Sequence, residues 1–139
     1  MLDETTNLKS MLRRPDLVCD AAFVGGEWKQ AASGATFAVM NPARGDVIAH
    51  IPDLSRAEVA QAIDAAQKAQ KPWAALAAKD RAKVLRKWYD LMIENQEDLA
   101  IIMTSEQGKP LAEARGEVAY GASFVEWFAE EAKRVYGQT

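Results

Sequence analysis

Residues 106–137 read EQGKPLAEARGEVAYGASFVEWFAEEAKRVYG, and this stretch decides the architecture of the chain. Gly108 is a typical helix-ending residue, and Pro110 suits the first turn of a new helix because that position needs no backbone N–H donor. Apolar side chains then recur at helical spacing until Gly137, which predicts a stop. We therefore expect one long helix over about residues 111–136. Its broad apolar side consists of Val118, Phe124, Val125, Phe128, Ala132 and Val135.

Two glycines, Gly116 and Gly121, lie inside this expected helix. Each interior glycine costs roughly 1 kcal/mol of helix stability relative to alanine. A close approach of another backbone or the wall of a cavity would explain them, and so would ordinary helix packing. The residues fit either interpretation.

Further helices are expected upstream of this stretch. Ser55 and Glu58 have the spacing of a capping box, in which their side chains satisfy free backbone N–H groups at a helix start. We expect that helix to be interrupted near Pro72, because proline lacks the N–H that a helix interior uses. Two more apolar stripes follow at helical spacing, separated by polar residues 94–97. They are Val84, Leu85, Trp88, Leu91 and Met92, and then Leu99, Ile102 and Met103.

The first third of the chain has the pattern of short strands. Residues 22–24 and 27–28 flank two glycines that can adopt the positive φ of a tight hairpin turn. Residues 37–40 and 47–51 are further strands around a turn, and a short helix is expected before Pro15. The predicted fold class is α+β and mainly α: an antiparallel β-meander followed by several helices.

Composition excludes several classes of protein. The chain has 139 residues, 49% of them apolar, and a formal charge of −3 with acids and bases interspersed, so we expect one folded domain, no second domain and no nucleic-acid or membrane partner. The first twenty residues mix acids and bases without an apolar run, which is typical of neither a signal nor a transit peptide. We expect a cytoplasmic protein.

Few residues are candidates for chemistry. Cys19 stands alone, which rules out an intrachain disulfide, and its neighbour Asp20 does not favour a reactive thiolate. His50 has no partner motif beside it. The closely spaced carboxylates Glu126, Glu130 and Glu131 are expected to form a solvated helix face. We therefore predict no catalytic and no cofactor-binding residue in this chain.

Four stretches, in this order and spacing, resemble the N-terminus of the aldehyde dehydrogenase family. They are Phe23–Trp28, Asn41–Ile48, Pro72–Trp73 and Glu106–Pro110. Residues 111–118 and 123–137 are similar to the succinate-semialdehyde dehydrogenase branch of that family, and glutarate-semialdehyde dehydrogenases share much of this pattern.

The resemblance implies an enzyme that oxidises an aldehyde to an acid with NAD or NADP through a cysteine thiolate. In that family the catalytic cysteine, the general-base glutamate and the cofactor-contacting positions lie C-terminal to the matched segment. Residues 1–139 would then be an incomplete N-terminal segment of the cofactor-binding domain, part of an α/β fold. Alone it would be inactive, would bind no cofactor, and would expose apolar surface. Its expected partners are the remainder of the chain or a second copy.

The same resemblance implies two structural roles for residues of this chain. The last helix would border the substrate tunnel through Gly116, Tyr120 and Phe124, one helical turn apart. A structural monovalent cation would be held by the Met40 carbonyl and the Glu106 carboxylate, both oxygen ligands suited to a hard cation. Two alternatives from other classes remain: a non-catalytic helical assembly module, and one half of a split enzyme.

Overall fold

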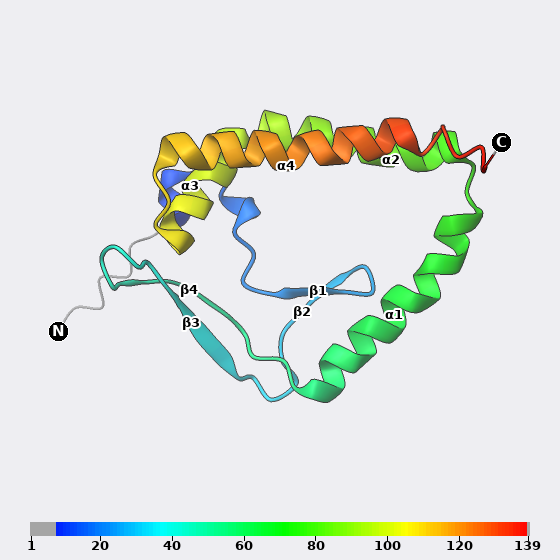
Figure 1. The fold of residues 1–139 in the computed structure, drawn as a ribbon. Coiled ribbons are helices and arrows are strands. Elements are labelled where there is room, and N and C mark those ends of the chain that lie inside the picture. Colours follow the sequence, from blue (N-terminus) through cyan, green and yellow to red (C-terminus); the bar gives the residue numbers. More distant parts are fainter. Residues whose placement is uncertain (1–7, 139) are drawn as a thin grey trace.

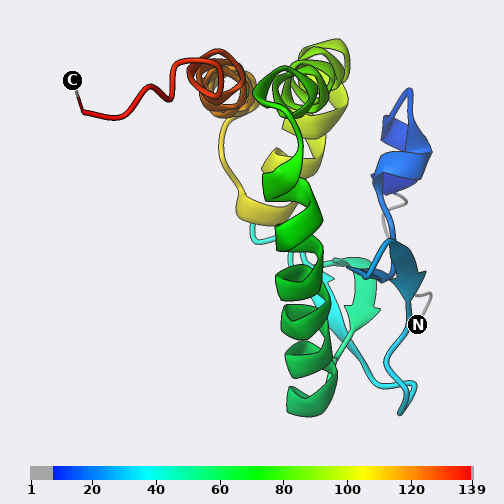
Figure 2. The ribbon, with the colours of Figure 1, turned by 90° about the vertical axis from the view of Figure 1, so that its right-hand side faces the viewer.

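The computed structural model describes residues 8–138. Helices α2 (Ala78–Glu94) and α4 (Leu111–Glu131) lie side by side along one edge, and α3 (Gln96–Gln107) packs near one end of the pair (Figures 1 and 2). α1 (Arg56–Ala75) leads from the short strands at the opposite edge up to the start of α2. This is the mainly helical α+β architecture that the sequence predicts.

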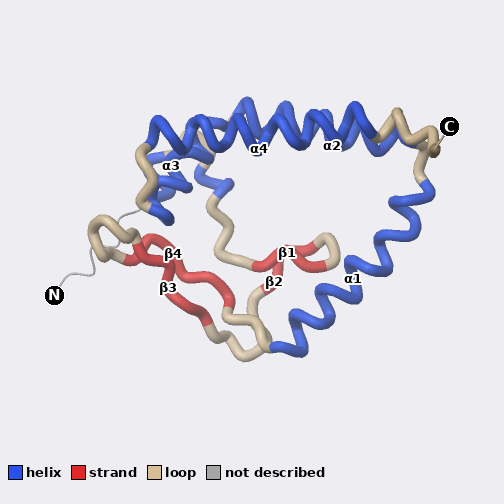
Figure 3. The backbone as a smooth tube through the Cα atoms, viewed as in Figure 1, coloured by secondary structure: helices blue, strands red, loops and turns tan. Residues whose placement is uncertain are grey.

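The strands form two separate antiparallel ribbons, as Figure 3 shows. β1 (Ala22–Val24) pairs with β2 (Glu27–Lys29), and β3 (Thr36–Met40) pairs with β4 (Val47–Pro52). Both predicted hairpins are therefore present. They differ from the predicted meander in one respect, because β2 and β3 are not paired with each other within residues 8–138.

The two turns explain why the ribbons separate. Between β1 and β2, Gly25 and Gly26 have φ values of 63° and 90°, as a two-residue hairpin turn requires. Between β2 and β3 the chain makes a wider loop, in which the backbone N–H of Ala32 donates to the Glu58 carboxylate at 2.8 Å. That loop is therefore tied to the start of α1 instead of closing a tight hairpin.

The predicted short helix before Pro15 is only partly present. The described part of it is a 3-10 turn at Leu8–Met11, and a second 3-10 turn follows at Pro15–Leu17; the earlier residues of that prediction, which include Leu2, lie outside the described residues.

Two predicted helix boundaries were wrong. α1 continues through Pro72 to Ala75, since proline removes one N–H donor but its fixed φ is compatible with a helix. α4 ends at Glu131, five residues before the predicted end. Val135 and Tyr136 are 85% and 77% exposed, so no packing holds those residues in a helix.

The core lies where α3 and α4 meet. Ala100, Ala114 and Val118 are buried there, with Leu99, Met103 and Leu111 packed around them. Gly108 ends α3 with a φ of 79°, as predicted, and its N–H donates to the Thr104 carbonyl at 2.9 Å. A Cβ on Gly108 would lie 3.0 Å from Cγ of Pro42, so the loop after β3 rests directly on this corner.

The buried side of α4 differs from the predicted one. The buried residues of this helix are small: Ala114, Val118, Ala122 and Ala129. Of the predicted apolar side, only Val118 is buried, while Phe124 and Phe128 are 47% and 58% exposed.

Candidate functional site

The predicted tunnel residues lie on one open face of α4. Gly116, Tyr120 and Phe124 follow one another at four-residue spacing, so each lies about one turn above the last. The rings of Tyr120 and Phe124 are 4.9 Å apart at 83°, an edge-to-face contact. A Cβ on Gly116 would meet no atom within 4 Å. The three residues are thus brought together, and Gly116 leaves the space above it open.

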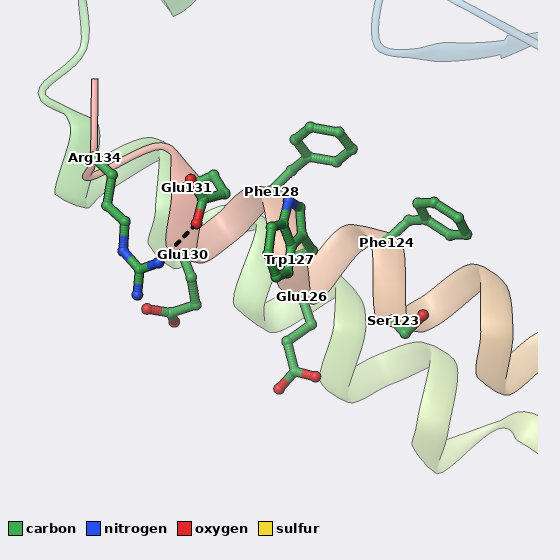
Figure 4. A pocket seen from close by; sticks show the side chains of 8 residues that line it. All are labelled: Ser123, Phe124, Glu126, Trp127, Phe128, Glu130, Glu131 and Arg134. Carbon is green, nitrogen blue, oxygen red and sulfur yellow. Dashed lines mark hydrogen bonds and ion pairs between the residues drawn. The ribbon is translucent and has the colours of Figure 1, made fainter. Parts of the chain in front are cut away.

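A cavity of about 630 Å³ continues along the second half of α4 (Figure 4). Phe124 and Phe128 project to one side of the helix, and Glu126 and Glu130 project to the other. Trp127 is 61% exposed between them. We refer to Phe124, Trp127 and Phe128 as the α4 aromatic cluster. The complete lining is Ser123, Phe124, Glu126, Trp127, Phe128, Glu130, Glu131 and Arg134.

The acidic side of this cavity is paired with a residue that the sequence analysis missed. Arg86 of α2 donates from Nη1 to Glu126 at 2.6 Å and from Nη2 to Glu130 at 3.0 Å. Lys133 also contacts Glu130, at 2.8 Å. Hydrogen bonds from Lys133 and then Arg86 lower the pKa of Glu130, and the two glutamates raise the pKa of Arg86. These carboxylates are partly solvated, as predicted, but they also join two helices; their spacing of four residues was the available signal.

The predicted cation ligands lie near each other only in part. Glu106 lines a cavity of about 210 Å³ together with Val39, Cys19 and Asp20, and Val39 precedes Met40 in β3. Within residues 8–138, no three His, Cys, Asp or Glu side chains are grouped so that they could hold a metal ion. The cation site stays a prediction.

The remaining candidate residues have surroundings that suit structural roles. Cys19 is half-buried, and the carboxylates of Asp20 and Glu106 line the same cavity, which does not favour a thiolate. His50 is exposed on β4. No helix in the described part of the chain is both long and apolar enough to cross a bilayer.

The sequence profile of the aldehyde dehydrogenase family matches residues 28–139, most of the chain. The chain belongs to the aldehyde dehydrogenase family. The resemblance inferred from the four short stretches is thereby confirmed. The helices and ribbons described above are a part of the aldehyde dehydrogenase fold, as expected, and the family places the chain among oxidoreductases.

Three relatives show how far the similarity extends. A glutarate-semialdehyde dehydrogenase of Pseudomonas putida is 57% identical over 128 residues, which are 92% of this chain and 27% of that protein. A 3-sulfolactaldehyde dehydrogenase of Pseudomonas putida is 59% identical over 128 residues, 92% of this chain and 26% of that protein. The crystal structure of a succinate-semialdehyde dehydrogenase from Burkholderia pseudomallei has 55% identity and a TM-score of 0.88, over 92% of this chain and 27% of that one.

This aldehyde dehydrogenase chain thus spans about a quarter of the length of the relatives it matches. Family members bind a nicotinamide cofactor: the structure of an indole-3-acetaldehyde dehydrogenase of P. syringae, at 29% identity, is a complex with NAD⁺. The candidate site of the present chain is accordingly a surface on α4 and its neighbours, not a set of reacting groups.

Proposed function

We propose that this chain is the N-terminal part of the cofactor-binding domain of a cytoplasmic dehydrogenase. The enzyme oxidises succinate semialdehyde to the dicarboxylic acid with NAD or NADP. Glutarate semialdehyde is the alternative substrate. The supporting observation is the 55–59% identity to enzymes that are named for succinate semialdehyde, glutarate semialdehyde and 3-sulfolactaldehyde. All three are short aldehydes that carry an anionic group, which defines the substrate class.

Within that enzyme, this segment supplies a wall of the substrate tunnel. Gly116, Tyr120 and Phe124 lie in line on an exposed face of α4, and the two rings contact each other edge to face. An apolar wall removes water from around a bound aldehyde and orients its carbon chain. The absence of a side chain at Gly116 keeps that end of the wall open.

The segment also supplies support at a distance from the wall. Glu106 borders the cavity beside β3, and with the Met40 carbonyl it holds a structural monovalent cation in our proposal. NAD or NADP, when bound by the rest of the enzyme, supplies the hydride acceptor. The residues of this chain then shape the aldehyde site and carry no proton or hydride.

The exposed apolar side chains of α1 and α2 support the proposed partners, either the remainder of the chain or a second copy. Val59 and Ile63 of α1 are 44% and 62% exposed, and Val84, Trp88 and Leu91 of α2 are exposed as well. Contiguous exposed apolar residues mark surfaces that another segment covers. The same observation favours a second candidate function, a non-catalytic assembly module, which predicts a stable complex that buries on the order of 2,000 Å² or more.

The test is an assay of the protein at the full length of its relatives, with NAD and NADP in turn. We expect turnover of succinate semialdehyde, less of glutarate semialdehyde, and little of butanal, which has the same carbon count as succinate semialdehyde but no carboxylate. Residues 1–139 alone are expected to show none. Equal turnover of butanal would sink the assigned substrate class, and an inactive full-length protein that forms a large stable complex would favour the assembly module.

A further inference from the structure

The two halves of α4 are held in different ways. Its first half packs through Ala114, Val118 and Ala122, all buried. Beyond Ala122, the only buried residue of α4 is Ala129. A single small contact leaves a helix free to turn about its axis, since alanine has no shape that keys into a neighbour. The α4 aromatic cluster lies in this weakly packed half.

Arg86 is the side chain that reaches this half from α2. Its two terminal nitrogens bond two carboxylates one helical turn apart, Glu126 at 2.6 Å and Glu130 at 3.0 Å. Its guanidinium carbon lies 5.2 Å from the ring centre of Tyr89, a cation–π contact within α2. The arginine is thus held at its own base and grips two successive turns of α4.

We propose that Arg86 is a positioning residue for the α4 aromatic cluster: by binding Glu126 and Glu130 together, it sets the rotation of the second half of α4. The inference rests on the proposed function, in which this face of α4 borders the aldehyde site. Phe124 and Phe128 project from the side of the helix opposite to Glu126 and Glu130 (Figure 4). Any rotation that loosens one pair therefore displaces the other.

The displacement is large enough to matter. A helix with its side chains is about 10–12 Å across, so a rotation of about 20° moves a ring near its surface by roughly 2 Å. A misplacement of about 1 Å in a substrate site can lower the rate up to about a hundredfold. The ion pairs themselves are partly exposed, with side-chain exposures of 38% for Arg86 and 42% for Glu126, and screened pairs of this kind add little stability. Orientation is the larger effect.

Lysine at this position cannot replace arginine. A lysine ammonium is one point charge on a flexible stem, whereas the planar guanidinium presents several donors in a fixed geometry. Arg86→Lys keeps the charge and can bind one glutamate at a time, so it leaves the rotation unfixed.

The experiment compares Arg86→Met and Arg86→Lys with Arg115→Met in the full-length enzyme. Arg115 is a matched control, because it joins α4 to α3 through two bonds to Glu97, at 2.6 and 2.7 Å, at the packed end of the helix. We expect both Arg86 variants to raise KM for succinate semialdehyde about tenfold, with kcat and KM for the cofactor changed less than about twofold. Arg115→Met should match the small loss of Tm but leave KM unchanged.

A second variant keeps the proposal testable if Arg86→Met does not fold. Glu126→Gln combined with Glu130→Gln removes the same ion pairs from the α4 side, and it should raise KM as Arg86→Met does, without a further rise when the three changes are combined. An active wild type whose KM is unchanged in these variants, or raised equally by Arg115→Met, overturns the positioning role alone. A wild type that oxidises no anionic aldehyde overturns the proposed function and this inference with it.

Discussion

The first and second halves of α4 have similar apolar content but opposite surroundings. In the first half, small side chains are buried against α2 and α3; in the second, Phe124, Trp127 and Phe128 are half or more exposed. Large aromatic side chains bury more apolar area than alanine, so hydrophobicity alone would reverse this order. The difference shows that close helix approach selects the small residues for the core.

The same contrast separates α1 from the α3–α4 corner. α1 has no buried residue, and its start is held by local hydrogen bonds of its capping box. The corner is held by contacts between residues far apart in the sequence. Packed and unpacked regions should therefore respond differently to matched substitutions.

The largest contrast is expected between Val118→Asp and Phe124→Asp. Val118 is 5% exposed in the core, so a carboxylate there is unpaired and buried, with an expected cost of about 3–5 kcal/mol. Phe124 is 47% exposed, so the same change should cost less than about 1 kcal/mol, although it removes a larger side chain. Chemical denaturation of the two variants measures both; equal losses would contradict the comparison.

Asp98 tests whether the packed corner extends to the N-terminal segment. It is 3% exposed, and its two carboxylate oxygens accept from the backbone N–H groups of Arg13 and Arg14, at 3.1 and 2.8 Å. Asp98→Ala leaves two donors without partners, so we expect a loss of about 1–3 kcal/mol. Asp90→Ala, at an exposed position of α2, is the control and should have no measurable effect. The outcome that counts against this tie is unchanged hydrogen exchange around residues 13–14.

A smaller contrast is expected between Gly108→Ala and Gly34→Ala. Both glycines have positive φ, 79° and 72°, so each substitution should cost about 1–2 kcal/mol from the backbone. Only at Gly108 does the new Cβ also approach Pro42, whereas at Gly34 it meets nothing within 4 Å. The difference in Tm between the two variants therefore measures the contact between the loop after β3 and the helical corner. If they lose the same Tm, that contact carries no strain.

The smallest effect is the pH dependence of the α1 start. Hydrogen bonds from Ser55 and then from the backbone N–H groups of Ala32 and Ser55 lower the pKa of Glu58. A carboxylate with a lowered folded pKa contributes stability that is fully present above the ordinary glutamate pKa of about 4.3, and this is lost as the pH falls through the folded pKa.

Glu58→Gln should remove that contribution, so the stability difference between the wild type and the variant should shrink on acidification below about pH 4.3. Denaturation at several pH values checks this. Glu97, whose pKa Arg115 lowers, titrates in both proteins and cancels in the difference. A difference that stays constant across this range would show that the Glu58 carboxylate is not held by the cap.

Local features were predicted from the sequence with most success. The capping box at Ser55, the hairpin at Gly25 and the αL end at Gly108 all form as expected, because each depends on residues within a few positions of one another. The family was also predictable, since its short motifs keep their order. The end of α4 was predicted too late, because apolar residues after Glu131 kept the helical spacing without any partner to pack against.

The sequence by itself determined where most helices and strands form and which family the chain belongs to. Only the tertiary structure decided which side of α4 is buried, and which distant groups hold the corner and the aromatic cluster. Arg86 meets Glu126 across 40 residues and Asp98 meets Arg14 across 84. The physical reason is that backbone conformation follows from neighbouring residues, whereas the rotation of a helix follows from the shapes and charges that other segments bring to it.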